Sequence, residues 1–384
     1  MNFIRSQQQE PTESSPLLAM GTSRNPRPLG RGGCQQNVKK INLIVIDIDS
    51  EMIDVLKVLY DKKYLPSNVS IEFVCQDFMD FTTDKTIDLI IGNPPFIKLS
   101  TQTITTYLTS NYNKQATNLA EFFLEKALTM ADYVSFVMPK NLLNTPEYAL
   151  TRQLLSQYSI LKILDIGEKG FKGVLIETIN ILISKVDKTN FVKVHSLIEN
   201  IEKLQPKNYI FDEKLPYWVI YRDDFFDDVA SKMIFGQFDV FRDRQITNSN
   251  SSLTKKSNTD IRIVKSRNID DTGTVLIDIE QYDAFIDNAL LQSMAVAKFL
   301  NRDDVYMTPN MTYKPRLMKK SKGYVVNGSV AILTPKNDIK LSHRQMAYIA
   351  SDEYCKFYKI ARNHQTRSLN IDNASVYWFG IYQG

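Results

Sequence analysis

The sequence has few cysteines and histidines, and none of them forms a recognisable motif. Its three cysteines, Cys34, Cys75 and Cys355, lie far apart without a CxxC pair, which excludes a disulfide framework and a zinc cluster. No run approaches the roughly 18 apolar residues of a membrane span, and the first residues lack the apolar core of a secretory signal. We therefore expect a cytoplasmic protein with no metal site and no membrane partner.

The chain also has little net charge for its size. Its 384 residues carry a formal charge of +4, which is too small to attract a polyanion unless the cations are gathered in one region. Hydrophobic residues make up 43% and charged residues 23%, a balance that excludes a wholly disordered chain. A chain of this length predicts two globular domains.

Three regions differ in their patterns. Residues 1–37 are rich in Ser, Gln, Pro, Gly and Arg and predict an irregular segment. Residues 38–196 alternate buried-type strands such as INLIVID with amphipathic helices such as NLAEFFLEKALTM, which predicts an α/β domain with an open, mostly parallel sheet. Residues 197–384 are short, mixed and loop-rich, and predict a second domain of α+β type.

Acidic residues follow two successive strands of the predicted sheet. Asp47 ends the strand in VIDID, where a carboxylate can bind the two hydroxyls of a ribose. Asp77 and Phe78 follow the next strand in VCQDF, where they could bind an adenine amine and pack on the base. Taken singly, each acid is equally well explained as a helix cap and Phe78 as a core residue, but their order and spacing favour a nucleoside site.

The tetrapeptide NPPF follows the third strand, IDLIIG. Open α/β sheets bind their ligands at the carboxyl ends of strands. Pro94 and Pro95 fix the backbone and remove two donors, so the segment presents carbonyl oxygens, the Asn93 amide and the Phe96 ring. Such a segment suits a planar base that bears an amine, although an isolated NPP is more often a plain turn.

With these motifs, residues 38–195 resemble the S-adenosylmethionine-dependent DNA methyltransferases that methylate adenine N6 in restriction-modification systems. The resemblance implies a Rossmann-like sheet, S-adenosylmethionine bound by Asp47, Asp77 and Phe78, and catalysis by Asn93, Pro94, Pro95 and Phe96. It implies that the target adenine is flipped out of the duplex and stacked between Phe96 and Phe171. It also implies double-stranded DNA as partner and a cognate restriction endonuclease.

One element of the family pattern is missing from the sequence. The family opens with a strand and a glycine-rich turn, but here Gly30, Gly32 and Gly33 follow no apolar strand and precede Ile41 too closely for the usual helix. The sheet is therefore expected to be incomplete at its first strand. A truncated or altered N-terminus, or a second polypeptide that completes the fold, explains this better than a permuted chain.

The second domain concentrates positive charge. Residues 314–367 hold twelve Lys and Arg against three Asp and Glu, interleaved with aromatic residues, which suits contact with nucleic acid. Its position and charge predict a DNA target recognition domain, although a solvated basic surface is an equally simple explanation. The candidates for phosphate contact are Lys314, Arg316, Lys319, Lys320 and Lys322.

The sequence thus predicts a sequence-specific adenine-N6 DNA methyltransferase, with a different class as the alternative. That alternative is a catalytically inactive, DNA-binding remnant without a competent cofactor site. Methylation of RNA or of a protein glutamine would use the same chemistry, and the basic second domain favours nucleic acid.

Overall fold

The chain forms two compact units in a computed structural model. One unit comprises Met1–Leu143 and Glu147–Phe211, and the other comprises Asn144–Pro146 and Asp212–Gly384. The division near residue 211 differs from the expected boundary at 196/197, because one more strand and a short helix continue the first sheet. The structure describes residues 18–23, 40–60, 65–100, 116–168, 176–253, 257, 259–310, 314–365 and 370–384.

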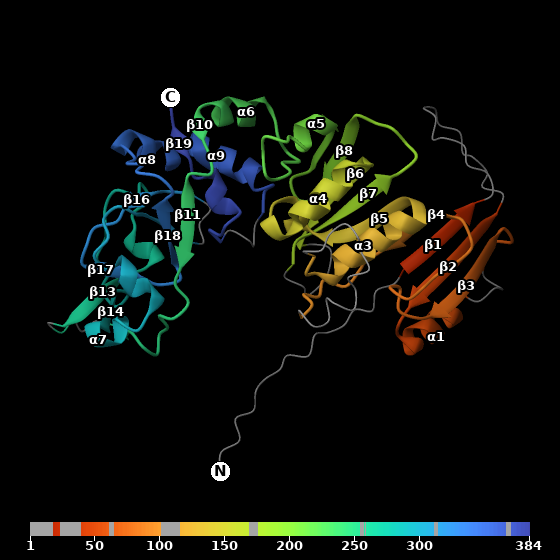
Figure 1. Ribbon diagram of the computed structural model, residues 1–384, viewed down its shortest axis with the longest axis horizontal. Helices are drawn as coiled ribbons and strands as arrows, with labels where there is room; N and C mark the ends of the chain where they lie inside the picture. Colours follow the sequence, from red (N-terminus) through yellow and green to blue (C-terminus); the bar gives the residue numbers. More distant parts are fainter. Residues whose placement is uncertain are drawn as a thin grey trace, which may run out of the picture. The chain divides into compact units, whose positions relative to one another are not determined.

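The first unit is built on a nine-stranded sheet with the order β3-β2-β1-β4-β5-β7-β6-β8-β9 (Figure 1). Strands β2 and β3, β4 and β5, and β6 and β8 pair in parallel, whereas β7 runs antiparallel to β5 and β6. The strands are β1 (Leu18–Ser23), β2 (Ile41–Asp47), β3 (Val69–Cys75), β4 (Ile87–Gly92), β5 (Ala131–Pro139), β6 (Ser159–Gly167), β7 (Thr178–Ser184), β8 (Phe191–Ser196) and β9 (Ile201–Pro206).

The sequence predicted that the sheet lacks its first strand, and strand β1 occupies that position. It lies between β2 and β4, antiparallel to both, and Leu18 pairs with Ile46 on one side and with Gly92 on the other. The expectation of an irregular segment is therefore wrong for Leu18–Ser23, and the other residues of 1–37 lie outside the described residues. The sheet is continuous, but its middle strand is reversed relative to its neighbours.

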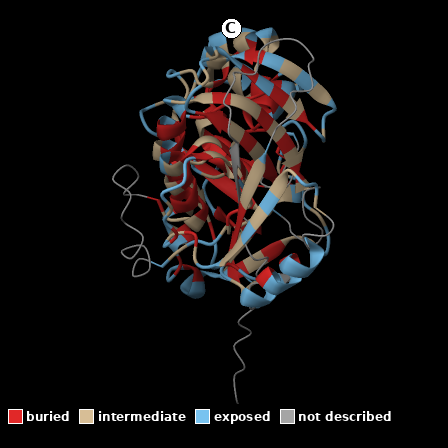
Figure 2. Ribbon diagram, turned by 90° about the vertical axis from the view of Figure 1, so that its right-hand side faces the viewer, coloured by how far each residue is buried: buried red, intermediate tan, exposed pale blue. Residues whose placement is uncertain are grey.

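The helices of the first unit connect the strands and cover the sheet. In α3, the Asn118 side chain caps the amino end, and Phe122, Phe123 and Leu124 are buried, which explains why the helix forms and packs beside β5. Figure 2 shows the buried residues gathered in the interior of the molecule. The helices are α1 (Ser50–Leu59), α3 (Leu119–Met130), α4 (Ala149–Ser156) and α5 (Lys207–Ile210), with 3-10 turns η2 (Lys140–Leu143) and η3 (Pro146–Tyr148).

The second unit contains three small sheets. A four-stranded sheet has the order β11-β18-β15-β16, another has the order β12-β14-β13-β17, and β10 pairs with β19. The strands are β10 (Met233–Ile234), β11 (Phe238–Arg242), β12 (Ser252–Leu253), β13 (Asp260–Val264), β14 (Ala284–Asp287), β15 (Tyr306–Pro309), β16 (Met318–Lys319), β17 (Tyr324–Val326), β18 (Val330–Pro335) and β19 (Ile381–Tyr382).

Helices and aromatic side chains complete the second unit. The rings of Phe226 and Phe357 stack at 4.8 Å where α6 meets α9, and Trp378 meets both edge-on. No helix in the described parts of the chain has the length and apolarity to cross a membrane. The helices are α6 (Asp224–Ser231), α7 (Asn288–Leu291), α8 (His343–Ile349) and α9 (Asp352–Ala361), with 3-10 turns η5 (Ser266–Asn268), η6 (Ala295–Phe299) and η7 (Ser375–Trp378).

Candidate active site

The predicted motifs of the first unit meet at one edge of its sheet. Asp47 is the last residue of β2 and pairs in register with Cys75 of β3, which places Asp77 just beyond it. Asn93 follows Gly92, the last residue of β4. Because β2, β3, β4, β5 and β6 run in the same direction, their carboxyl ends form a single edge, called here the carboxyl edge.

The NPPF segment, residues 93–96, presents a buried acceptor at the carboxyl edge. Pro94 is buried, and Pro95 and Phe96 are half-buried. The side-chain oxygen of Asn93 is buried, and no described residue donates a hydrogen bond to it. An unpaired buried acceptor costs about 1–3 kcal/mol, so this oxygen is suited to a donor supplied by a ligand.

The chain beyond the NPPF segment is tied to the start of α3. The Leu99 N–H donates to the Thr117 carbonyl at 2.8 Å, and the Leu119 N–H donates to the Ile97 carbonyl at 2.9 Å. The buried Glu121 carboxylate accepts from the backbone N–H of Thr117 at 3.4 Å and from the Thr151 hydroxyl. Burial raises the pKa of Glu121. These bonds hold the NPPF segment against a rigid helix.

Asp47 presents a buried carboxylate at the carboxyl edge. The residue is 1% exposed, and its Oδ1 accepts from the Asp49 N–H at 2.9 Å. No described residue donates to its Oδ2. Burial raises the pKa of Asp47, and the Asp49 carboxylate adds to this effect. A ligand with hydroxyl donors would satisfy this oxygen and lower that pKa.

Asp77 and Phe78 lie beside Asp47 but differ in exposure. The half-buried Asp77 accepts from the Met79 N–H at 2.8 Å through Oδ1. Phe78 is 3% exposed, and its ring packs on Phe123 of α3 at 5.1 Å. The Phe78 ring is therefore chiefly a core residue that supports the edge, and it offers a ligand little open surface.

Phe171, the expected second stacking residue, lies outside the described residues. The residues on either side of its loop are held by a buried ion pair that the sequence reasoning missed. Lys140 Nζ lies 2.7 Å from Asp165 and 3.8 Å from Glu177, and the side chains of Lys140 and Asp165 are each 1% exposed. The Lys140 N–H also donates to the Glu177 carbonyl at 2.8 Å. A lysine directly after the apolar strand YVSFVMP was the only signal available.

The described residues include candidates for binding the adenosine half of the cofactor, but they do not show how its methionine half would be bound. The free oxygen of Asp47, with Asp77 beside it, fits the donors of an adenosine. For the methionine half, β1 is reversed, and its last residue, Ser23, pairs with Ile41 at the edge opposite the carboxyl edge. Gly30, Gly32 and Gly33 lie outside the described residues.

Two of the predicted phosphate-contacting residues of the second unit are internal. Lys320 is 0% exposed and donates from Nζ to the carbonyls of Ser321 at 2.8 Å, Arg302 at 3.3 Å and Leu300 at 3.4 Å. Burial lowers the pKa of Lys320 to about 8. The buried Arg316 donates to the Ile269 carbonyl at 3.1 Å. The expectation of phosphate contact is wrong for Lys320 and is not supported for Arg316, because both side chains are buried and donate to backbone carbonyls of the protein.

The other three candidates are on the surface. Lys314 lies 3.5 Å from Asp352, and Lys322 lies 3.6 Å from Asp303, in ion pairs that remain open to solvent. Lys319 is exposed on the short strand β16. Surface pairs of this kind contribute little to stability, so phosphate contact stays a prediction for these three lysines.

Comparison with protein families gives a match over the candidate site residues of the first unit. Residues 35–171 match the model of a family described as Eco57I restriction-modification methylase. The matched range contains Asp47, Asp77 and the NPPF segment. Over these residues the chain is similar to methyltransferases of restriction-modification systems. No curated protein matches the chain.

Solved structures of similar fold include restriction-modification enzymes. The Type IIL enzyme MmeI in complex with DNA has a TM-score of 0.52 at 10% identity, over 82% of this chain and 50% of that one. A class I S-adenosylmethionine-dependent methyltransferase from Listeria monocytogenes has 18% identity and a TM-score of 0.34, over 40% and 48% of the two chains. The chain spans about half the length of these relatives. The predicted α/β sheet with an α+β second domain is confirmed, the fold is similar to that of MmeI, and the first-strand position is filled by β1.

Proposed function

We propose that the protein transfers a methyl group from S-adenosylmethionine to the N6 amine of an adenine in duplex DNA, as the modification enzyme of a restriction-modification system. The observation that carries this proposal is the side-chain oxygen of Asn93, directly after β4, which is buried and accepts no hydrogen bond from any described residue. It lies in the range that matches a restriction-modification methylase family. The proposal places the protein in the cytoplasm, with a cognate endonuclease acting on the same DNA site.

The NPPF segment suits an amine that must become a nucleophile. The lone pair of an adenine amine is delocalised into the ring, so acceptors that bind both N–H groups favour a more tetrahedral nitrogen. Asn93 Oδ1 and the Pro94 carbonyl would supply these acceptors and would stabilise the positive charge that develops on the nitrogen. Since attack needs no earlier deprotonation, the chemistry does not require a histidine or cysteine base.

Base flipping would bring the adenine to this segment. An amine inside a duplex cannot align with a methyl donor, and extrusion of the base costs a few kcal/mol. The half-buried Phe96 ring would stack on the flipped base, and Phe171 would cover its other face. The NPPF form favours adenine over cytosine through its resemblance to the adenine-N6 enzymes.

The cofactor would lie along the carboxyl edge beside Asn93. Bound S-adenosylmethionine supplies an electrophilic methyl group. Asp47 would accept from the ribose hydroxyls through its unpaired Oδ2, and Asp77 would accept from the adenine amine while Phe78 supports the pocket from the core. Binding should therefore lower the pKa of Asp47 and leave the carboxylate fully charged.

One observation favours a second candidate function, a DNA-binding remnant without activity. The reversed β1 ends at Ser23, which pairs with Ile41, so this strand does not end at the carboxyl edge, where the family's glycine-rich turn would follow the first strand. Incubation of the full chain with duplex DNA and methyl-labelled S-adenosylmethionine, followed by digestion to nucleosides and mass spectrometry, separates the two. Labelled N6-methyldeoxyadenosine supports the proposal. DNA binding without label supports the remnant, and label only in cytosine overturns the choice of adenine.

A further inference from the structure

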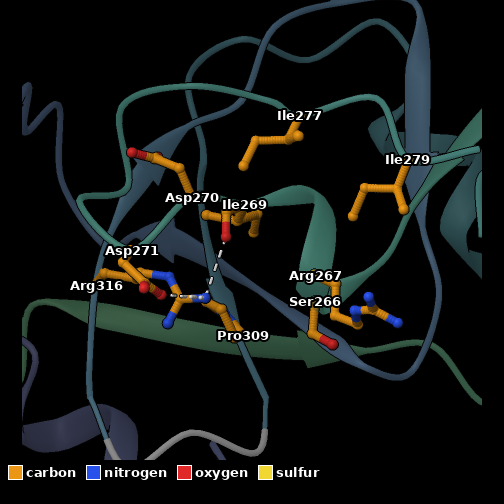
Figure 3. Close-up of a pocket in the computed structure, with 9 residues that line it drawn as sticks. All are labelled: Ser266, Arg267, Ile269, Asp270, Asp271, Ile277, Ile279, Pro309 and Arg316. Atoms are coloured by element: carbon orange, nitrogen blue, oxygen red, sulfur yellow. Dashed lines mark hydrogen bonds and ion pairs between the residues drawn. The ribbon is translucent and has the colours of Figure 1, made fainter.

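The second unit contains a hollow of about 480 Å³ that none of the motifs above uses (Figure 3). It lies beside the turn η5 and the loop that follows it. Ile277 and Ile279 line it at the top of the view, Arg267 lies at its right and Arg316 at its left. Pro309 of β15 extends its apolar lining. The hollow therefore combines an apolar wall with cationic donors.

The turn beneath the hollow is rigid. Asn268 is 0% exposed, and its amide donates to the Ile277 carbonyl at 2.9 Å and to Asp283 at 2.6 Å. The Ile277 N–H returns a bond to the Asn268 carbonyl at 2.8 Å. The Ser266 N–H donates to the Ser329 hydroxyl at 3.0 Å. The apolar wall and the turn that carries Arg267 are thus fixed relative to each other before any ligand binds.

Arg267 is the cation that the fold leaves available. Its guanidinium lies 4.8 Å from the centre of the Tyr282 ring, where Lys265 Nζ also lies at 3.8 Å. The side chain is exposed, and within the described residues no carboxylate or carbonyl accepts from it. Arg316, across the hollow, differs because its guanidinium donates to the Ile269 carbonyl. Stacking on Tyr282 restricts the rotamers of Arg267 and leaves its donors unused.

We infer that this hollow reads a guanine edge in the DNA target, with Arg267 donating to guanine O6 and N7. The inference rests on the proposed function and deepens it by naming a residue that determines specificity. Paired donors of an oriented arginine match the paired acceptors of guanine in the major groove. Ile277 and Ile279 suit a base face or a thymine methyl group next to it. The carboxylates of Asp270 and Asp271, which also line the hollow, would repel a phosphate.

The test is selection of bound duplexes from a randomised DNA pool by the full chain, which requires no methyl transfer. The wild-type protein should enrich one motif with a G·C pair that Arg267→Ala no longer selects, with a loss of preference of about 10- to 100-fold at that position. Arg267→Gln should lose guanine at the same position. Arg344→Ala, which removes an exposed arginine on α8, is the matched control and should leave the motif unchanged.

Two results would overturn the inference. One is an unchanged motif in both Arg267 variants, with binding weakened equally for all sequences, which would make Arg267 a phosphate contact. The other is the absence of any enriched motif with the folded wild-type chain. Methyl transfer is measured separately on the same preparations, so a selected motif without transfer contradicts the proposed function and leaves the role of Arg267 intact.

Discussion

Asn93 and Asp47 at the carboxyl edge of the first unit and Lys320 in the second unit differ in how their buried polar atoms are satisfied. Asn93 and Asp47 each bury an oxygen that no described residue satisfies. Lys320 buries a cation that three carbonyls of its own chain satisfy. A buried group left unsatisfied is costly and is suited to a ligand, whereas a satisfied one is part of the fold.

The difference separates two kinds of sequence signal, position at a strand end and local charge. The ends of apolar strands single out Asn93 and Asp47, and strand direction alone brings such residues to one edge. Local charge singles out Lys320 and Arg316, and it carries no information about exposure. Five neighbouring cations divide into two that are buried and three that are open to solvent.

Removal of the buried cation at the carboxyl edge should have the largest effect. Lys140→Met leaves the Asp165 carboxylate buried without its cation and should lower the free energy of unfolding by about 3–5 kcal/mol. Lys193→Met, which breaks an exposed pair with Glu202, should change that free energy little. Urea unfolding of both variants measures the difference. Equal losses would show that burial of the Lys140 pair has no energetic consequence.

Asn93→Ala tests the unsatisfied oxygen directly. Loss of this acceptor should slow methyl transfer by about 100- to 1,000-fold, because it acts on charge that develops in the transition state. DNA affinity and the unfolding midpoint should stay near the wild-type values. Single-turnover methylation gives the rate, and Asn190→Ala, an exposed asparagine of the same unit, is the control. A parallel loss of rate, affinity and stability would make Asn93 structural.

Asp47→Asn should weaken cofactor binding by about 10- to 100-fold, the loss expected for a hydrogen bond to a charged acceptor. Titration calorimetry with S-adenosylmethionine measures the Kd, and Asp54→Asn, at an exposed surface pair, is the control. The raised pKa of Asp47 adds a pH dependence, since wild-type affinity should fall as pH falls through that pKa. An affinity that is unchanged by Asp47→Asn would remove Asp47 from the cofactor site.

Lys320 should make the free energy of unfolding depend on pH in the alkaline range. Its pKa is about 8 in the folded chain and about 10.5 unfolded, so between these values the unfolded chain binds more protons and stability rises with pH. The slope from this group is at most about 1.4 kcal/mol per pH unit. The free energy of unfolding of the wild type should be higher at pH 9.5 than at pH 8, and Lys320→Met should lack this gain. The same gain in both proteins would assign it to other groups.

The smallest effect concerns the exposed lysines. Neutralising Lys319 and Lys322 together should reduce the slope of log affinity for DNA against log salt by about 2, one for each phosphate contact. Lys320→Met should leave this slope unchanged, because its ammonium is internal. Binding titrations from low to moderate salt decide the matter. A reduced slope for Lys320→Met alone would reverse the assignment of surface and internal cations.

Strand β1 marks the limit of what the sequence could predict about the fold. The strands β2 to β7 and the helix α3 follow from apolar runs and from the Asn118 cap. The run PLLAMGTS is short, and a strand hydrogen-bonded on both sides can run in either direction without a change in its apolar pattern. Its reversed insertion between β2 and β4 depends on pairing with distant residues.

The ion pair of Lys140 was beyond prediction for a similar reason. Lys140, Asp165 and Glu177 are far apart in the sequence, and they meet only because β7 runs antiparallel between β5 and β6. The expected boundary at 196/197 falls between β8 and β9, and these two short strands pair as an antiparallel hairpin that the sequence pattern does not show.

Sequencing of modified bases in a host that lacks adenine methylation tests the central claim most directly. Expression of the full chain should produce N6-methyladenine in one recurring motif, and expression of Asn93→Ala at the same level should produce none. That result would show that a sheet with a reversed β1 supports methyl transfer at the carboxyl edge. Soluble wild-type protein with no modified adenine, or equal modification by Asn93→Ala, would contradict the account.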